Sequence, residues 1–229
     1  MQNLFENKNR TSILLSMPLP ASLAHHTQTR ATPCLPLLPE GAQHGLGHGL
    51  ALGRVHEACG PARQRFALWL AAQTEGPVIW ITPDWTTENL NPCGLAPFVD
   101  PARLLLVHAK RPDDVLWSME EVLRSGTVPL VIADLPGLPG LTPVRRMHLA
   151  AEKGGAGKGQ APLGLLLTPG RGGAQGVESR WHLAPAHHGN PGGWTLSRLR
   201  ARTAPEQAWH IARTPGQPLP RIAGSIKAA

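Results

Sequence analysis

The stretch that decides the fold is residues 55–72, VHEACGPARQRFALWLAA. A short apolar segment is followed by the turn-forming pair Gly-Pro, and then by a run in which Phe66, Trp69 and Leu70 recur at helical spacing. This order indicates a strand, a tight loop and a helix with an apolar face. The sequence therefore predicts the opening strand and helix of an α/β domain, although an ordinary turn before a helix explains the Gly-Pro pair equally well.

The loop has the frame of a phosphate-binding loop without its contacts. A working loop follows the pattern Gly-x-x-x-x-Gly-Lys-Ser/Thr, because backbone N–H groups surround the phosphates, the lysine neutralises their charge and the hydroxyl binds Mg²⁺. Counted from Gly60-Pro61, the second glycine is replaced by Arg65, the lysine by Phe66 and the hydroxyl residue by Ala67. We therefore predict that the chain binds no nucleotide cofactor and does not hydrolyse ATP.

The rest of the chain alternates strands and helices before the pattern changes. Apolar runs predict strands at 78–81, 104–107, 130–134 and 163–168, and periodic segments predict helices at 62–74, from Asp113 to Gly126 and at 142–152. Such alternation is typical of a parallel sheet with helical crossovers. After residue 168, three segments with Trp-x-aliphatic alternation indicate antiparallel strands whose tryptophans lie in the core. They are Trp181/Leu183, Trp194/Leu196 and Trp209/Ile211.

Composition predicts one domain flanked by irregular segments. The 229 residues suffice for one domain with tails. Residues 1–49 are polar and then proline-rich, so we expect them to be poorly ordered, with a core domain at 50–213 and an irregular basic tail at 214–229.

Apolar patterning and cysteine spacing favour a cytoplasmic protein without a membrane partner. No segment approaches 18 uninterrupted apolar residues, and the three cysteines are widely separated. A signal peptide at 13–23 is a weaker alternative, because prolines interrupt that run. Neither a disulfide framework nor a metal site is expected.

Positive charge is concentrated in the C-terminal part. Residues 1–140 carry ten Lys/Arg and twelve Asp/Glu, whereas residues 141–229 carry twelve and three. This asymmetry indicates weak, salt-dependent DNA binding, for which Arg145, Arg146 and Arg171 are the candidates. Scattered arginines on solvated surfaces are the equally simple alternative.

Six stretches together resemble a known family. They are HEACGPARQRFALWLA, PVIWITPDW, the long segment DPARLLLVHAKRPDDVLWSMEEVLRSGTVPLVIADLPGL, LTPVRRMHLAAE, LGLLLTP and SRWHLA. In this order the chain resembles the RecA-type recombinase core over roughly residues 50–213 and, more narrowly, the ImuA family of SOS mutagenesis proteins, with 100–151 the most specific part. The resemblance implies a RecA-like three-layer α/β core, with parallel strands and helical crossovers followed by antiparallel C-terminal strands.

The resemblance also assigns vestigial site residues. Gly60 and Pro61 match the opening of the recombinase phosphate loop, whereas the three positions that end it depart from the family pattern. Asp134 matches the acidic residue that would hold a Mg²⁺-bound water, and Asp84 lies near the position of the catalytic glutamate. Residues 169–177 match the flexible loop that contacts DNA in recombinases and here offer only Arg171.

The function that the resemblance implies is a non-catalytic role in damage-induced translesion DNA synthesis. The implied partners are an inactive Y-family polymerase homologue and an error-prone replicative-type polymerase, with RecA and DNA as further candidates. A SulA-type inhibitor of a tubulin-like division protein is the alternative, and a residual RecA-like ATPase is a third. The basic tail predicts the partner-binding residues Arg213, Arg221, Ile222 and Lys227.

Overall fold

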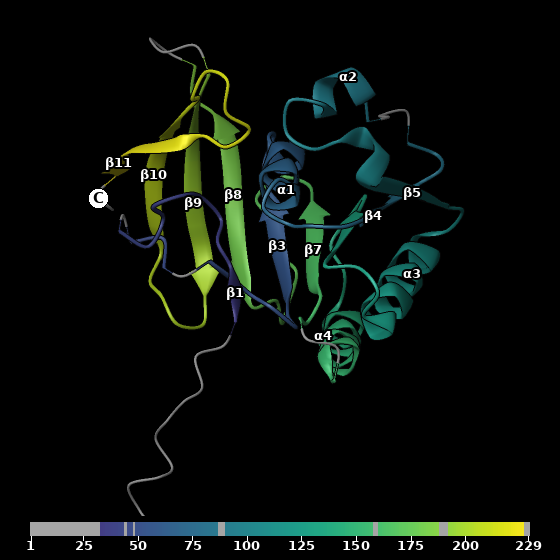
Figure 1. Ribbon diagram of the computed structural model, residues 1–229. Coiled ribbons are helices and arrows are strands. Elements are labelled where there is room, and N and C mark those ends of the chain that lie inside the picture. The colour runs from purple at the N-terminus through teal and green to yellow at the C-terminus, as the bar shows by residue number, and fades with distance from the viewer. Residues whose placement is uncertain are drawn as a thin grey trace, which may run out of the picture. The chain divides into compact units, whose positions relative to one another are not determined.

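The computed structural model describes residues 33–43, 45–47, 49–86, 90–157, 160–187 and 192–226. Its centre is a nine-stranded sheet with the strand order β11-β10-β9-β8-β3-β7-β6-β4-β5 (Figure 1). Two short strands, β1 (Cys34–Leu35) and β2 (Leu50–Ala51), form a separate antiparallel pair. The domain is thus mixed α/β, as the sequence predicts.

One half of the sheet is parallel and the other half is antiparallel. Parallel pairing joins β3 to β7 and β8, β7 to β6, β6 to β4 and β4 to β5. Antiparallel pairing joins β8, β9, β10 and β11 in turn. The strands are β3 (Val55–Cys59), β4 (Val78–Pro83), β5 (Leu104–Ala109), β6 (Leu130–Asp134), β7 (Leu163–Thr168), β8 (Ser179–Pro185), β9 (Gly193–Ala201), β10 (Gln207–Ala212) and β11 (Arg221–Ile226).

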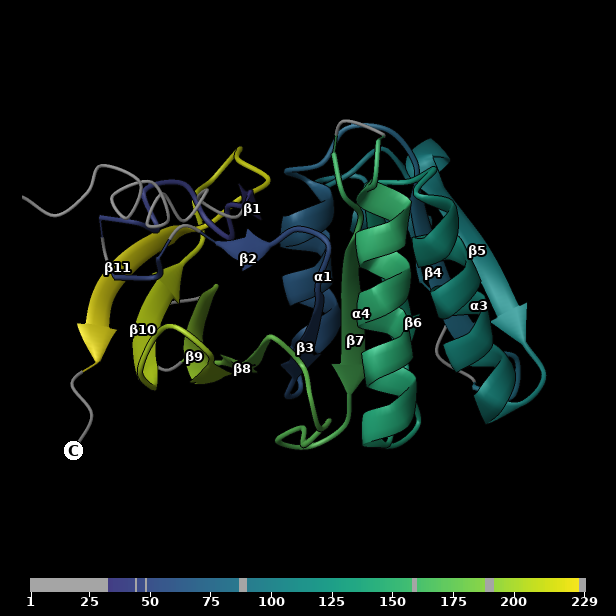
Figure 2. The ribbon, with the colours of Figure 1, turned by 90° about the horizontal axis from the view of Figure 1, so that it is seen from below.

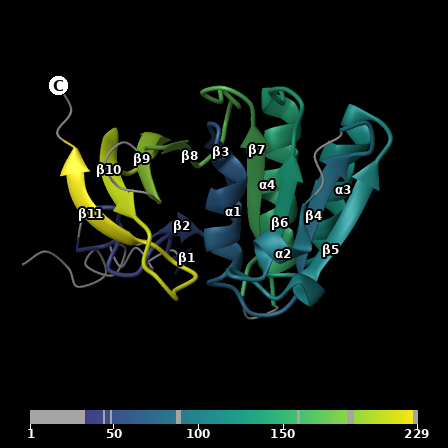
Figure 3. The ribbon, with the colours of Figure 1, turned by 90° about the horizontal axis from the view of Figure 1, so that it is seen from above.

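Helices cover both faces of the sheet and divide the core in two. The crossovers are α1 (Arg63–Ala71), α3 (Pro112–Ser125) and α4 (Leu141–Gly155), while α2 (Pro92–Leu95) and a 3₁₀ turn (Pro101–Arg103) precede β5. Side chains alternate along β6, so Leu130 and Ile132 pack with α1 whereas Val131 and Ala133 pack with α3 and α4. Figures 2 and 3 show α3 and α4 lying together beside the parallel strands. None of the described helices is long and apolar enough to cross a membrane.

Two glycines let α3 and α4 approach closely at their C-terminal ends. Helix α3 ends, as predicted, at Gly126, which adopts a left-handed conformation with φ of 60°. A Cβ atom at Gly126 would overlap the backbone of Gly154 in α4, and a Cβ atom at Gly154 would overlap the carbonyl oxygen of Leu123. Only glycine fits both positions, so the helix end and the helix contact depend on the same residues.

The core begins earlier than the sequence predicts. The sequence places residues up to 49 in a poorly ordered segment, yet Leu35, Leu37, Leu38 and Leu46 are buried in the cluster around α1. The Gln73 side chain fixes this stretch by donating to the carbonyl oxygens of the two residues 36 and 37. Prolines limit regular structure here to the two-residue strand β1 but do not prevent leucine side chains from packing, which explains the difference.

The C-terminal segment is also more regular than predicted. Residues Arg221–Ile226 form strand β11, antiparallel to β10, where the sequence analysis expects irregular structure. Ile222 is partly buried against the α1-side cluster, and exposed residues alternate with it along the strand. Two partly buried isoleucines, Ile222 and Ile226, together with backbone pairing suffice for a strand, although the segment lacks the Trp-x-aliphatic alternation used to find the others.

Two of the three tryptophans predicted to lie in the core, Trp181 and Trp209, do so, whereas Trp194 is only partly buried. Trp181 and Trp209 are buried with their rings stacked 6.1 Å apart, and Phe66 of α1 packs against Trp181. Arg198 is buried over both tryptophan rings, and its guanidinium donates to the backbone oxygens of Pro205, Gly45 and Leu46. This arginine ties the N-terminal leucine segment to the antiparallel strands.

A buried histidine joins β3 to β2 and β8. His56 Nε2 lies 3.0 Å from the carbonyl oxygen of Ala51, and Nδ1 lies 2.7 Å from Ser179 Oγ. The carbonyl only accepts, so Nε2 carries the proton and Nδ1 accepts from the hydroxyl. Burial lowers the pKa of His56 from 6.5 to about 4, and the hydrogen bond to Ala51 opposes this only in part.

We expect His56 to make stability depend on pH. Its pKa in the folded chain lies below its pKa in the unfolded chain, so the unfolded chain binds more protons between pH 6.5 and about 4. The free energy of unfolding therefore falls by about 2 kcal/mol from pH 6.5 to pH 5 on account of this residue. Urea denaturation of the wild type and of His56→Gln at both pH values checks this. Equal losses in the two proteins would contradict the assignment.

Candidate functional site

The segment predicted to be a vestigial phosphate loop is a tight turn between β3 and α1. Gly60 has φ of 91°, and a Cβ atom there would lie 2.6 Å from the carbonyl oxygen of Leu183 and 2.8 Å from the ring of His182. Helix α1 begins at Arg63, so two of the four residues that would surround a phosphate are already helical. The retained glycine serves the close approach of β8, and the turn is too short to enclose a phosphate group.

Backbone N–H groups of this turn are used within the protein. Ala62 donates to the carbonyl oxygen of Leu183 at 3.1 Å, and Arg63 donates to that of Gly60 at 3.2 Å. Phe66 donates to the carbonyl oxygen of Ala62 at 3.2 Å. A phosphate-binding loop instead directs several N–H groups at its ligand. At these three positions the donors are therefore committed to the fold.

Phe66 and Ala67 stand where a working phosphate loop has its lysine and its hydroxyl residue, and both lie in the core. Phe66 and Ala67 are both fully buried, and the ring of Phe66 lies 6.2 Å from that of Trp181. Six consecutive residues of α1, from Phe66 to Ala71, are buried, so this helix is covered on most sides. The two replaced positions thus contribute to hydrophobic packing, worth about 2 kcal/mol for a phenylalanine.

The acidic residue at the end of β6 is bound by α1. Asp134 Oδ1 accepts from Arg63 Nε at 3.4 Å, and Oδ2 accepts from Gln64 Nε2 at 3.1 Å. A pocket of about 300 Å³ lies beside it, lined also by Arg63, Thr82 and Trp85. The guanidinium therefore supplies positive charge where a nucleotide-bound cation would act in a working site. Asp84 lies just after β4, is exposed and does not line this pocket.

Glu57 is the central buried charge of the sheet and is not among the residues predicted from the sequence. It lies in the middle of β3, and its Oε2 forms an ion pair with Arg180 Nε of β8 at 2.5 Å. Its Oε1 accepts from Thr168 Oγ1 at 2.6 Å and from the N–H groups of Gly173 and Ala174 at 2.8 and 3.1 Å. An acidic residue inside a five-residue strand buried throughout was the available signal, since such charges are buried only when paired.

Glu57 holds the loop at 169–177, which the sequence resemblance matches to the DNA-contacting loop of recombinases. Arg180 also donates to the carbonyl oxygen of Ala174 at 2.9 Å, so residues on both β3 and β8 fix the same turn. A Cβ atom at Gly172 would lie 2.6 Å from Glu57 Oε1, which explains the glycine. The resemblance implies a flexible loop at 169–177, whereas these contacts fix its centre to the sheet. Arg171 remains exposed at its surface.

The predicted DNA-contacting arginines differ in their surroundings. Arg145 is exposed and lines a pocket at the N-terminal half of α4. Arg146 is 2.8 Å from the buried carboxylate of Glu120 in α3, which also binds Arg124, so its charge is partly neutralised. Glu120 of α3 thus links the two helices through Arg146 of α4. This contact is not predicted from the sequence.

The predicted partner-binding residues differ in their exposure. Arg213 is exposed just after β10, and Arg221 is exposed at the start of β11. Ile222 is partly buried against the α1-side cluster of its own chain, and its role as an apolar anchor for a partner stays a prediction. Lys227 lies outside the described residues.

No family model matches the chain, and a search of curated proteins finds no match. Among the described residues, no cluster of three or more His, Cys, Asp or Glu has an arrangement that would hold a metal ion.

Replacing Glu57 by glutamine is expected to lower the free energy of unfolding by about 3–5 kcal/mol, because Arg180 keeps a buried charge without its partner. Glu121→Gln is the matched control, since that carboxylate pairs with Arg124 on the exposed surface of α3 and should cost at most about 1 kcal/mol. Urea denaturation measures both. Similar losses in the two variants would contradict the central position given to Glu57.

Proposed function

We propose that the chain is a non-catalytic accessory protein of damage-induced, error-prone translesion DNA synthesis, built on a RecA-like core. The observation that carries the non-catalytic part is the burial of Phe66 and Ala67 beside a turn whose N–H donors are engaged. Without the lysine and the hydroxyl, a triphosphate loses the charge neutralisation and the metal contact that its transfer requires.

The sheet supports the RecA-like part of the proposal. Parallel strands joined by helices on both faces continue into antiparallel strands within one sheet, as the sequence resemblance implies. Gly60 and Asp134 occupy the ends of β3 and β6, where that core would place its phosphate loop and its acidic residue. The family assignment to ImuA rests on the sequence stretches alone.

Several exposed apolar side chains support a role in protein contacts. Leu105 and Leu106 are half-exposed on β5, an edge strand of the sheet, and Trp117 of α3 is 58% exposed. Large apolar groups on an unpaired edge are typical of surfaces that bind another protein. We propose that the partners are the inactive Y-family polymerase homologue and the error-prone replicative-type polymerase, with RecA and weakly bound DNA as further contacts in the cytoplasm.

Two other functions are separable from this one. A SulA-type inhibitor would bind a tubulin-like division protein and would share the same nucleotide-free core. A residual ATPase would need a route to Mg²⁺ binding at Asp134 that avoids Arg63, which lies 3.4 Å from that carboxylate. Because Arg63 pairs with Asp134, we favour the SulA-type inhibitor over the residual ATPase as the alternative function.

Co-purification tests the proposed function. We expect the full-length chain to retain the inactive polymerase homologue and not the tubulin-like division protein, equally with and without Mg-ATP. Arg213→Gln with Arg221→Gln should reduce recovery, because these exposed cations lie at neighbouring ends of β10 and β11, where the sequence predicts a second partner contact apart from β5. Arg200→Gln, an exposed arginine of the adjacent strand β9, is the matched control.

Retention of the division protein alone would overturn the proposal in favour of the SulA-type function. Recovery that requires ATP would overturn its non-catalytic part. Equal recovery of the wild type and the double variant would move the interface away from β10 and β11.

A further inference from the structure

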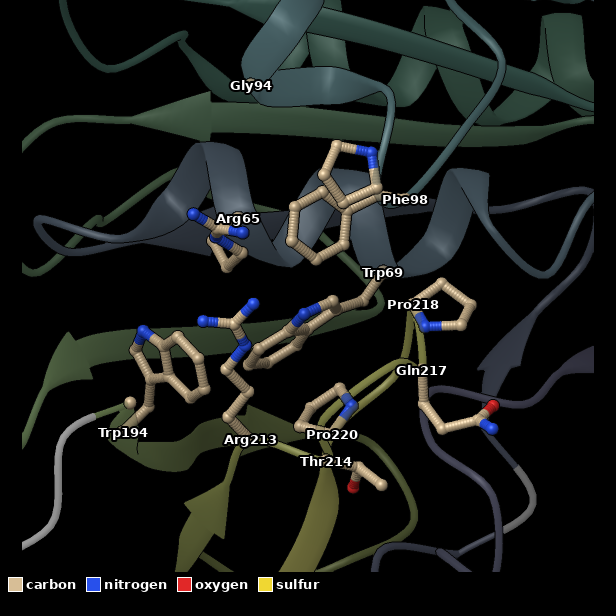
Figure 4. A pocket seen from close by; sticks show the side chains of 12 residues that line it. Arg65, Trp69, Gly94, Phe98, Trp194, Arg213, Thr214, Gln217, Pro218 and Pro220 are labelled. Carbon is tan, nitrogen blue, oxygen red and sulfur yellow. The ribbon is translucent and has the colours of Figure 1, made fainter.

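A pocket of about 290 Å³ lies between α1 and the segment that joins β10 to β11 (Figure 4). Arg65 and Trp69 reach it from α1, and Arg213 and Pro220 from the connecting segment. Phe98, Trp194 and Pro218 complete walls that consist mainly of aromatic and proline rings. The pocket is separate from the vestigial phosphate site beside Asp134, with which it shares no lining residue.

Two arginines in this pocket have no acidic partner among the described residues. Arg65 lies over the ring of Phe98 at 4.3 Å from its centroid, and neither Arg65 nor Arg213 forms an ion pair within the described chain. Figure 4 shows the Arg213 guanidinium between Trp69 and Trp194, and the Arg65 guanidinium nearby, beside Phe98. Burial and, secondly, the charge of Arg213 lower the pKa of Arg65, so the two cations repel each other in the absence of an anion.

The backbone fixes the position of Arg213. Its N–H donates to the carbonyl oxygen of Gly192 at 2.9 Å, and its side chain passes over that glycine. Gly192 has φ of 89°, and a Cβ atom there would lie 3.0 Å from Arg213 Cβ. The adjacent Trp194 packs edge-on against Trp69 with 5.4 Å between ring centroids. Arg213 and Trp194 are therefore both positioned by the N-terminal end of β9.

A second pocket extends the first along α1. It has a volume of about 490 Å³, shares Arg65, Gly94 and Trp194 with the first, and continues to Pro61 and His187. No acidic residue occurs among the described residues that line either pocket. We call the two pockets together the α1 groove. Its extent exceeds a single side chain, so an extended ligand fits it better than a compact anion.

We propose that the α1 groove binds a short acidic peptide segment, whose carboxylates pair with Arg65 and Arg213 and whose apolar side chains contact the aromatic and proline walls. Guanidinium groups bind carboxylates through paired hydrogen bonds, and the groove supplies two of them without a competing acid. A single-stranded nucleic acid would need several open aromatic faces for successive bases, but Trp69 is only 1% exposed, Arg65 covers Phe98, and Trp194 alone is partly exposed among these three rings. The inference rests on the proposed function only in that a partner protein would supply the segment.

The test uses the full-length protein and two fluorescein-labelled hexapeptide libraries. One library combines Asp and Glu with Leu, Phe, Trp and Pro, and the other replaces the acids by Asn and Gln. We expect the protein to enrich peptides from the acidic library only, and the enriched peptide to quench tryptophan fluorescence. Arg65→Gln and Arg213→Gln should each weaken its binding by about tenfold or more.

Arg200→Gln, which removes an exposed charge outside the α1 groove, should leave the affinity unchanged. Because Arg65 is half-buried, Arg213→Gln provides the decisive variant if Arg65→Gln does not fold. Equal enrichment from both libraries, or equal weakening by Arg200→Gln, would overturn the proposal. So would binding of a short oligothymidylate that depends on Arg213 and displaces the peptide. The titration needs no polymerase, so its failure is distinguishable from failure of the proposed function.

Discussion

The two halves of the sheet depend on the hydrogen bonds and the ion pair that the buried carboxylate of Glu57 forms. It lies at the centre of β3, where parallel pairing with β7 meets the first strand of the antiparallel half. Its oxygens accept hydrogen bonds from β7, from the loop after β7 and from Arg180 of β8. A fully buried charge is tolerated only with such complete pairing, so the junction admits one arrangement of these three segments.

The turn at Gly60, where the sequence predicts a vestigial phosphate loop, is closed by contacts with the same strand, β8. Strand β8 approaches the turn at Gly60 so closely that a side chain would not fit, and its carbonyl at Leu183 takes the N–H of Ala62. Phe66 then packs on Trp181 of the same strand. At this turn the chain has side-chain packing and backbone hydrogen bonds where a phosphate-binding loop has a lysine, a hydroxyl residue and free N–H donors. The core is therefore stabilised by its own residues where a nucleotide-binding core uses its ligand.

Sequence reasoning recovered the features that periodicity and turn chemistry determine. The helix that ends at Gly126, the strand that ends at Asp134 and the buried tryptophan pair Trp181 and Trp209 were all predicted from local pattern. Burial of Phe66 was predicted from its helical spacing to Trp69. Each of these depends on residues that are close in the chain or share one face of an element.

Features that depend on distant residues were not predictable in this way. Glu57 and Arg180 are separated by 123 positions, and nothing in either local pattern pairs them. Strand β11 exists because β10 offers it an edge, and the leucines at 35–46 pack because α1 offers them a surface. The α1 groove combines Arg65 with Arg213, and only the fold brings these arginines together.

Calorimetric titration with Mg-ATP tests the central claim most directly, with RecA as the positive control. The account predicts no saturable, Mg²⁺-dependent heat in the micromolar range, because Phe66 is buried and Arg63 occupies the carboxylate of Asp134. A one-to-one, Mg²⁺-dependent site with micromolar affinity would contradict it.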